Sequence, residues 1–585
     1  MENLLVYLKN YKKESMLAPL FKMLEATFEL FVPLVMAAII DKGIVGQDMP
    51  YILKMGSVLV LLAIVGLASS VTAQYFAAKA ATGFATKLRQ ALFKHIQNLS
   101  FTEMDIIGNN TLITRMTSDI NQVQSGVNMT LRLFLRSPFI VFGAMIMAFT
   151  VDVKAALVFV VAIPLLSIVV FGVMLVNIPL YKKVQAALDE VLGKTRENLT
   201  GVRVIRALNM EEQEKEVFEE KNETLTNMQK LVGRIAGLTN PLTYIIVNGS
   251  LVVIVWIGAL RVESGFLTQG MVVALVNYML QILVELIKLA NLIVTMTKAV
   301  ACGNRVQSIF EVSSCLDSGT IEDFIEQDHK SYIEFNDVSF TYKNAGQQAL
   351  AHIDFKVAKG EVVGIIGGTG SGKTSIVNLM PRYYEVTSGQ VKIAGKDVKD
   401  YSLKALRENV GMVMQKAELF KGSIRDNLKL GNQTATDEEI WQALEIAQAA
   451  SFVKAKEGQL DYWIEQAGKN LSGGQKQRLT IARALVCKPD ILILDDSASA
   501  LDFATDAALR KAIYEMEAKP TVFIVSQRAA SIMHADKILV LDEGELVGKG
   551  THEALLESCK VYKEIYDSQF RKEVKENEQI GKERG

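Results

Sequence analysis

The chain has 585 residues, of which 50% are apolar and 22% are charged, and its formal net charge at neutral pH is −1. This apolar content excludes global disorder, and the lack of net positive charge argues against nucleic acid as the main partner. At about 150 residues per domain, the length predicts roughly four domains. The composition is uneven, because residues 155–181 carry no charge whereas residues 571–585 are mostly charged or polar.

The first half of the chain contains six stretches that approach or exceed the roughly 20 apolar residues needed to cross a bilayer core. The clearest lie between Lys154 and Lys182 and between Arg234 and Arg261, and the least clean is the first, which contains charged residues. We therefore predict a six-span membrane domain with spans at about 17–40, 55–78, 133–151, 155–181, 235–260 and 269–297.

The loops between these spans alternate in length. Two of them, 79–132 and 182–234, are each about fifty residues long and carry many basic residues, which places them in the cytoplasm together with the Lys-rich N-terminus. Both are rich in Leu, Ala, Lys, Glu and Gln and contain no Pro. We expect helical hairpins that extend the membrane helices into the cytoplasm, and an inserted soluble domain is the alternative.

Polar residues inside predicted spans are costly and usually functional. The last span carries five of them at steps of four, four, three and three, which keeps them on one helical face: Asn277, Gln281, Glu285, Lys288 and Asn291. We predict that this face lines a water-filled cavity, and that Glu25 and Glu29 of the first span do the same. The alternative for the last span is a simple ion pair between Glu285 and Lys288 within the helix.

The second half of the chain begins with a phosphate-binding pattern. A predicted strand, residues 362–366, leads into a glycine-rich loop with the P-loop spacing: Gly367, Gly368, Thr369, Gly370, Ser371, Gly372, Lys373 and Thr374. Glycines let backbone N–H groups surround phosphates, Lys373 supplies a positive charge, and the Thr374 hydroxyl can bind Mg²⁺. The sequence therefore predicts a nucleotide-binding site.

Two further motifs follow the P-loop. One, which precedes a predicted helix, consists of Leu471, Ser472, Gly473, Gly474 and Gln475, and the other is a buried strand that ends in Asp495 and Asp496. These motifs and the six spans resemble an ATP-binding cassette (ABC) exporter half-transporter, and the resemblance covers nearly the whole chain. It implies a multidomain fold, with an all-α six-helix transmembrane domain of the type IV exporter kind and an α/β P-loop ABC ATPase domain.

The resemblance also implies domain boundaries and residue roles. The domains are a transmembrane domain at 1–300, a linker at 301–330, an ABC domain at 331–570 and a charged tail at 571–585. In the ATP site, Tyr342 would stack on adenine (or is a strand core residue), Ser375 would complete the P-loop, Gln415 and Asp495 would join Thr374 at Mg²⁺, and Asp502 would belong to the D-loop. The LSGGQ motif, 471–475, would close on ATP held by a second subunit. Segments 104–119 and 197–207 resemble the cytoplasmic coupling segments.

Several positions depart from the family pattern. Asp496 stands where the family usually has a Glu general base, and Gln527 replaces the switch His. Asp is one methylene shorter than Glu, so its reach falls by about 1.5 Å, and Gln cannot carry a proton or a charge. Gln466 replaces a usual Glu, and Ala498 replaces a usual Thr. This pattern resembles the degenerate-site subunit of a bacterial heterodimeric multidrug exporter.

We therefore predict ATP-driven efflux of drugs or other amphipathic compounds across the cell membrane by a heterodimer. This chain would supply a weakly hydrolytic ATP site and the LSGGQ for its partner's competent site. Four alternatives remain open: a homodimer with slow hydrolysis, an exporter of lipid or peptide, a siderophore importer, and a nucleotide-gated regulatory membrane protein.

Overall fold

The computed structural model describes residues 2–313, 316–324, 331–343, 345–497 and 500–570. The chain divides into two compact units. The first, called the helical unit here, comprises Met1–Gln97 and Asn110–Val312. The second, the α/β unit, comprises Asn98–Asn109 and Ser313–Gly585.

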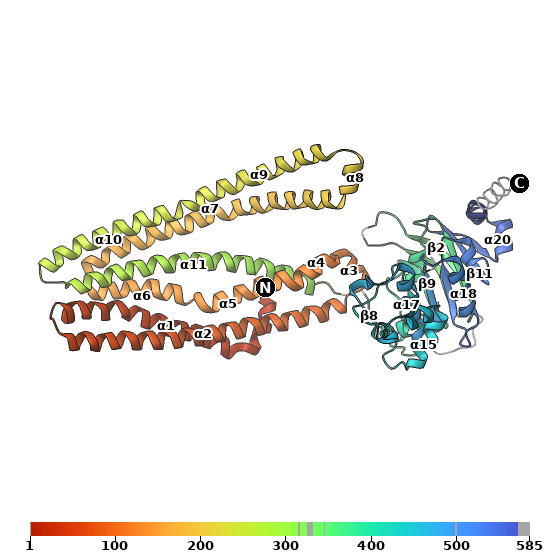
Figure 1. The fold of residues 1–585 in the computed structure, drawn as a ribbon, viewed down its shortest axis with the longest axis horizontal. Helices are drawn as coiled ribbons and strands as arrows, with labels where there is room; N and C mark the ends of the chain where they lie inside the picture. The colour runs from red at the N-terminus through yellow and green to blue at the C-terminus, as the bar shows by residue number, and fades with distance from the viewer. Residues whose placement is uncertain (1, 314–315, 325–330, 344, 498–499, 571–585) are drawn as a thin grey trace. The chain divides into compact units, whose positions relative to one another are not determined.

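The helical unit is built from long helices (Figure 1). Its elements are η1 (Glu2–Tyr11), α1 (Lys12–Ala38), η2 (Ile39–Ile44), α2 (Met49–Gln97), α4 (Asn109–Thr114), η3 (Arg115–Asp119), α5 (Ile120–Leu133), α6 (Arg136–Val151), α7 (Val153–Thr200), α8 (Val202–Ala207), α9 (Glu211–Gly237), α10 (Thr239–Glu263) and α11 (Gln269–Phe310). Within the described residues, six helical segments are long and apolar enough to cross a membrane: Leu4–Ile44, Met49–Gln97, Asn109–Val151, Val153–Thr200, Glu211–Glu263 and Gln269–Phe310. Each contains one of the six predicted spans.

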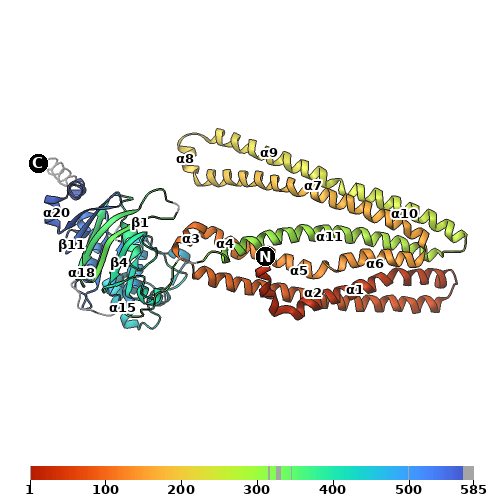
Figure 2. The ribbon, with the colours of Figure 1, turned by 180° about the vertical axis from the view of Figure 1, so that it is seen from behind.

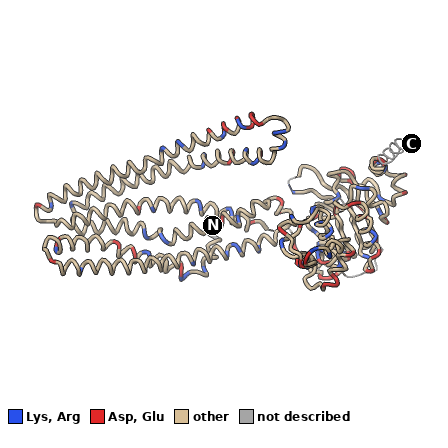
Figure 3. The backbone as a smooth tube through the Cα atoms, in the orientation of Figure 1, with Lys and Arg blue, Asp and Glu red and all other residues tan. Residues whose placement is uncertain are grey.

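Both long loops are mostly helical. Helix α7 continues without a break from its apolar part to Thr200, and α9 returns alongside it (Figures 1 and 2). Figure 3 shows Lys, Arg, Asp and Glu gathered near the α8 end of this hairpin and sparse where α7 lies beside α10. The segment predicted as a linker, 301–330, differs at its start, because α11 continues as a helix to Phe310.

Small residues allow the helices of this unit to approach closely. A Cβ added at Gly126 of α5 would lie 2.2 Å from the Cβ of Ala299 in α11, and one at Gly143 of α6 would lie 2.5 Å from Leu30 of α1. Without a hydrophobic drive between helices in lipid, such close packing is a main source of association. Leu30 belongs to a buried cluster that also includes Phe159 and Tyr278.

The α/β unit contains helix α3 (Phe101–Ile107), followed after the long helices by strands and short helices. Its strands are β1 (Ile333–Phe340), β2 (Leu350–Val357), β3 (Val362–Gly367), β4 (Ser388–Ile393), β5 (Lys396–Asp397), β6 (Val410–Val413), β7 (Gly422–Ser423), β8 (Trp463–Ile464), β9 (Ile491–Asp495), β10 (Thr521–Val525), β11 (Lys537–Asp542) and β12 (Glu545–Gly550). Its later helices are α12 (Lys373–Leu379), α13 (Leu403–Asn409), α14 (Ile424–Lys429), α15 (Asp437–Ile446), α16 (Ala450–Lys454), η4 (Gln459–Asp461), η5 (Gln466–Gly468), α17 (Gly473–Val486), α18 (Phe503–Tyr514), α19 (Ala529–Ile532) and α20 (His552–Ser558), and residues 560–570 form one more helix.

Three sheets organise these strands. The largest has the order β12-β11-β3-β10-β9-β6 and is parallel except for β12, and a four-stranded antiparallel sheet has the order β2-β1-β4-β5. Strands β7 and β8 form the third. Strand β1 has an irregular register around Asp337, whose φ is +49°.

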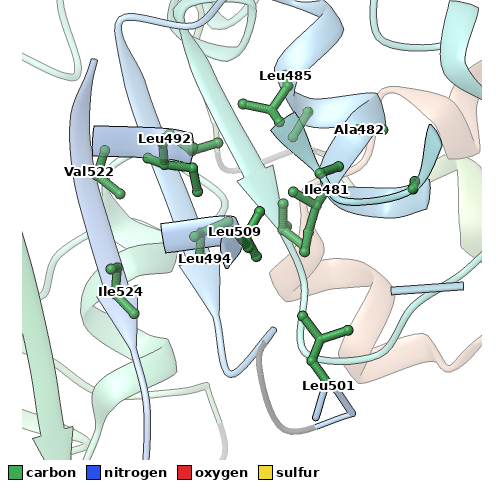
Figure 4. Close-up of a cluster of buried hydrophobic side chains, with 14 of the residues drawn as sticks. Ile481, Ala482, Leu485, Leu492, Leu494, Leu501, Leu509, Val522 and Ile524 are labelled. Carbon is green, nitrogen blue, oxygen red and sulfur yellow. The ribbon is translucent and has the colours of Figure 1, made fainter. Parts of the chain in front are cut away.

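The central strands of the six-stranded sheet are buried on both faces. Leu492 and Leu494 of β9 and Val522 of β10 belong to the same cluster as Ile481 and Leu485 of α17 (Figure 4). The residues between them in sequence, including Ile493 and Phe523, pack into a second cluster on the opposite face. This explains why these strands are continuous apolar runs without alternating polar residues.

Strands β3, β10 and β9 are parallel neighbours, so their carboxyl ends lie at one edge of the sheet. Ligands in open α/β sheets bind at this edge. The P-loop follows β3 there, and Asp496 and Ser526 directly follow β9 and β10.

Candidate nucleotide-binding site

The P-loop connects β3 to α12 by a turn that requires glycine. Gly370 and Gly372 have φ of +84° and +92°, which side-chain-bearing residues rarely adopt, whereas a Cβ added at Gly368 or Gly370 would meet nothing within 4 Å. The backbone is thus bare where phosphates would approach. Ser371 closes the turn by donating its hydroxyl to the Gly368 carbonyl at 2.9 Å, and Thr369 is exposed beside it.

Lys373 points back into this loop. Its Nζ donates to the carbonyl oxygens of Gly367 at 2.9 Å and Gly368 at 2.5 Å, and the residue is 9% exposed. Burial lowers the pKa of Lys373, although the charges of Asp496 and Asp495 counteract part of this effect. A buried ammonium whose hydrogen-bond partners are mainly neutral carbonyls fits an anionic phosphate.

Asp495 ends strand β9 beside the P-loop helix. The Thr374 hydroxyl donates to Asp495 Oδ1 over 3.1 Å, and Asp495 is 2% exposed. Burial raises the pKa of Asp495, and the negative charge of Asp496 raises it further, against the hydrogen bond from Thr374. A hydroxyl and a carboxylate oxygen at this distance suit Mg²⁺, which prefers one or two protein oxygens together with phosphate.

The next residue, Asp496, has a left-handed backbone with φ of +45°. Asp and Asn tolerate this conformation better than most other side chains do. Its N–H donates to Val525 O of β10 at 3.0 Å, and Gln415, in the loop after β6, donates its amide to Asp496 Oδ2 at 3.3 Å. The structure therefore brings the two polar residues Gln415 and Asp496 together beside Asp495.

Gln527 follows β10 at the same sheet edge. Ser526 N donates to Ile365 O of β3 at 3.0 Å, which fixes the start of this switch loop, residues 526–529, next to the P-loop strand. Gln527 is exposed. Gln527 therefore lies just after β10, at the sheet edge that also holds the P-loop.

Tyr342 lies after β1, outside any strand, so it is not a strand core residue. Its hydroxyl is 2.9 Å from the Ser375 hydroxyl of α12, and its ring makes edge contacts with Phe340 and Tyr384. An aromatic ring attached in this way to the P-loop helix is suitably placed for a base bound next to the phosphates.

The LSGGQ residues form the start of helix α17. Ser472 is the N-cap: its hydroxyl accepts from Gln475 N at 3.3 Å, and its own N–H donates to Gln475 Oε1 at 3.1 Å. Leu471 is buried, but Ser472 and Gly473 are exposed, and a Cβ at Gly474 would lie 3.1 Å from Ala500 O. The motif is a capped helix N-terminus that is open to solvent, which favours a negatively charged ligand.

The other predicted positions are less informative. Asp502 caps helix α18 by accepting from Thr505 N at 2.9 Å, and Gln466 opens η5. Ala498 lies outside the described residues.

Comparison with known proteins decides the family. Residues 15–286 match the family "ABC transporter transmembrane region" and residues 350–499 match the family "ABC transporter". The chain is 36% identical over 578 residues to the uncharacterized ABC transporter ATP-binding protein YfiB of Bacillus subtilis, covering 99% of this chain and 100% of that protein. The chain belongs to the ABC transporter family.

Two further comparisons extend this result. The transporter is 32% identical over 588 residues to a putative multidrug export ATP-binding/permease protein, YgaD, of Bacillus subtilis, covering 97% of this chain and 99% of that one. The solved structure of a bacterial Atm1-family ABC exporter with ATP bound matches with a TM-score of 0.77 at 22% identity, over 96% of this chain and 98% of that chain. The transporter therefore has the ABC exporter fold, spans the membrane several times, binds ATP, and couples ATP hydrolysis to the movement of substrates across the membrane.

The first predicted coupling segment begins in α3, which belongs to the same compact unit as the transporter's ATPase core. Tyr384 donates its hydroxyl to Asp105 Oδ2 at 2.6 Å, and Phe101 packs against Tyr383 with ring centroids 4.6 Å apart. Burial, and then the hydrogen bond to Asp105, raise the pKa of Tyr384. The second predicted segment, 197–207, covers the end of α7 and helix α8, where Val204 is exposed.

The polar face predicted on the last span lines a cavity of about 390 Å³ in the transporter's helical unit. Asn277, Gln281, Glu285 and Lys288 line it together with Glu29 of α1, whereas Asn291 does not. Lys288 also pairs with Glu285 at 2.7 Å, so the cavity and the ion pair coexist. Glu25 and Glu29 line a neighbouring cavity of about 530 Å³.

Sequence reasoning missed the centre of this network. Arg136, which begins α6, donates to Glu285 Oε1 at 2.6 Å and to Glu29 Oε2 at 2.7 Å, and Ser137 donates to Glu285 Oε2 at 2.8 Å. Arg136 is 6% exposed, so its charge requires these carboxylates. The available signal was a lone Arg at the edge of an apolar stretch.

Proposed function

We propose that this transporter is one subunit of a heterodimeric exporter of drugs or other amphipathic compounds. It would contribute a weakly hydrolytic ATP site and the LSGGQ motif that completes the partner's competent site. The proposal also places the N-terminus and the α/β unit on the cytoplasmic side, which the basic residues of the long hairpins support.

The proposal rests mainly on the identity of Asp496, the residue after Asp495. The binding groups are intact: Lys373 is buried in the P-loop, and Thr374 and Asp495 are hydrogen-bonded. When bound, Mg²⁺ would neutralise charge on the ATP phosphates. A general base must reach the water that it activates, and Asp496 is about 1.5 Å shorter than the Glu usual in the family.

One contact of Asp496, its backbone angle and the side chain at the switch position also support a weakly hydrolytic site. The Asp496 carboxylate accepts a hydrogen bond from Gln415, and its left-handed φ of +45° suits Asp better than a longer side chain. Gln527, at the switch position, can donate and accept hydrogen bonds but cannot carry a proton. These features favour ATP retention over rapid hydrolysis at this site.

The cavity in the helical unit supports an amphipathic substrate. Its lining combines the polar side chains of Glu29, Asn277 and Lys288 with apolar Met36 and Leu280. Cavities of this mixed character bind molecules that have both polar and apolar parts. YgaD, a relative named as a putative multidrug exporter, points to the same class.

The direct test compares the full-length chain alone with the chain co-expressed with a half-transporter from the adjacent gene. We expect low ATPase activity alone and high activity in the pair. In the pair, Asp496→Asn should change turnover less than about threefold, whereas the same change at the partner's base should lower it by at least about a hundredfold. High activity of the chain alone that Asp496→Asn abolishes would instead show a homodimer.

Transport itself is measured separately. Proteoliposomes that contain the pair should accumulate a fluorescent amphipathic dye with ATP but not with a non-hydrolysable analogue. ATP binding without dye movement, across a panel of amphiphiles, would favour a regulatory role or a different substrate class.

A further inference from the structure

The switch loop, residues 526–529, is held by a side chain from the far end of the described chain. Gln569 accepts from Ala529 N at 2.9 Å through Oε1 and donates from Nε2 to Gln527 O at 2.7 Å. One amide group thus bonds the backbone on both sides of Arg528, as a neighbouring strand would. Gln527 is the residue that occupies the switch position.

The helix that carries Gln569, residues 560–570, is firmly attached to the α/β unit. Tyr562 is fully buried and its hydroxyl lies 2.7 Å from Nδ1 of His552. Tyr566 stacks on Phe570 with ring centroids 4.4 Å apart, and both pack against the main core cluster. Because its helix is fixed, Gln569 can hold the loop in one place.

Helix α19 has its own contacts to α18. Arg510 of α18 donates to Ala530 O at 3.0 Å, and Ser531 donates its hydroxyl to Asp506 Oδ2 at 3.1 Å. These contacts fix helix α19, which follows the switch loop, but they do not reach the backbone of Gln527. The Gln569 amide, by contrast, ties the Gln527 backbone directly to the helix at 560–570.

We propose that Gln569 is a positioning residue for the ATP site: it fixes the Gln527 backbone so that the Gln527 side chain meets the terminal phosphate. The inference rests on the proposed role of Gln527 at the switch position. A neutral amide binds phosphate only by directional hydrogen bonds, so its contribution depends on orientation more than that of a charged His would. Gln569 supplies that orientation.

The test uses the full-length chain with its dimer partner and a photoreactive azido-ATP. After photolabelling, the two subunits are separated, so that the label on this chain reports nucleotide bound at its own site. We expect Gln569→Met, which keeps the side-chain length but removes both hydrogen bonds, to speed loss of bound nucleotide about three- to tenfold. Gln569→Glu, which keeps only the acceptor for Ala529 N, should have an intermediate effect. Ser568→Ala, which removes a local hydrogen bond of the same helix, is the matched control and should have none.

A double substitution separates positioning from general stabilisation. Gln527→Ala should speed release to a similar extent, and adding Gln569→Met should then change release no further. An additive double variant would overturn the inference, because Gln569 would act independently of Gln527. If Gln527→Ala speeds release but Gln569→Met does not, the positioning role of Gln569 is refuted and the role of Gln527 stands. If Gln527→Ala has no effect, the assignment of Gln527 to the switch position is refuted.

Discussion

The P-loop and the LSGGQ helix lie in one unit but are held in opposite ways. Lys373 is buried and bonded to backbone carbonyls of its own loop, and the neighbouring Asp495 is buried beside Thr374. Ser472 is exposed, and its hydrogen bonds to other described residues lie within its own helical turn. The first site is built from contacts within this chain, whereas the exposed start of α17 fits the proposed contact with a second subunit.

The largest effect is expected from a substitution that disrupts the first site, the P-loop. Lys373→Met should weaken ATP binding to this chain by about ten- to hundredfold, because it removes a charge-assisted contact to phosphate. Azido-ATP labelling of this subunit in the pair measures the change. Labelling of the partner serves as the control and should stay within about twofold, and an equal loss on both subunits would contradict two separately assembled sites.

A smaller effect is expected from a substitution in the second site, the LSGGQ motif. Ser472→Ala should lower ATP turnover by the pair about five- to tenfold, because the helix loses its N-cap and the hydroxyl offered to phosphate. ATP labelling of this chain's own P-loop should be unchanged. If labelling of this subunit falls instead, the LSGGQ motif serves the site of its own chain.

The smallest expected effect concerns the charge of Asp495 in the first site when no nucleotide is bound. The pKa of Asp495 is higher in the folded protein than in the unfolded chain. Ionised Asp495 therefore lowers the free energy of unfolding at pH values above its folded pKa, and this loss disappears as the pH falls through the folded pKa. The Asp495→Asn variant should therefore unfold at a higher temperature than the parent at pH 8, by about 2–4 °C for each kcal/mol gained in the free energy of unfolding. Calorimetry without nucleotide and with a chelator should show this gain shrinking as the pH falls toward the ordinary range of an Asp carboxyl. A gain that does not vary with pH would exclude the charge as its cause.

Most of the fold and the core of the site could be predicted because their signals are local. The P-loop, the strand that ends in Asp495, and the six spans each depend on residues that are adjacent in sequence. The predicted cavity face also needed only the helical period of residues 277–288. Hydrophobic periodicity and glycine spacing determine such features without knowledge of the tertiary contacts.

The missed residues depend on contacts between distant segments. Arg136 meets Glu285 from 149 positions away, and Tyr384 meets Asp105 from 279 positions away. Gln569 lies 42 positions from the loop that it holds. Each is an ordinary polar residue in its own sequence neighbourhood, so only the packing of helices and sheets reveals its partner.

Helix α3 has a practical consequence for work on the isolated ATPase. Because residues 98–109 belong to the α/β unit, a fragment that begins at residue 331 would lack part of its own unit. The ring of Tyr383 would lose Phe101, and the Tyr384 hydroxyl would lose Asp105. Such a fragment would expose an aromatic patch prone to self-association, and supplying residues 98–109 as a peptide should restore its solubility.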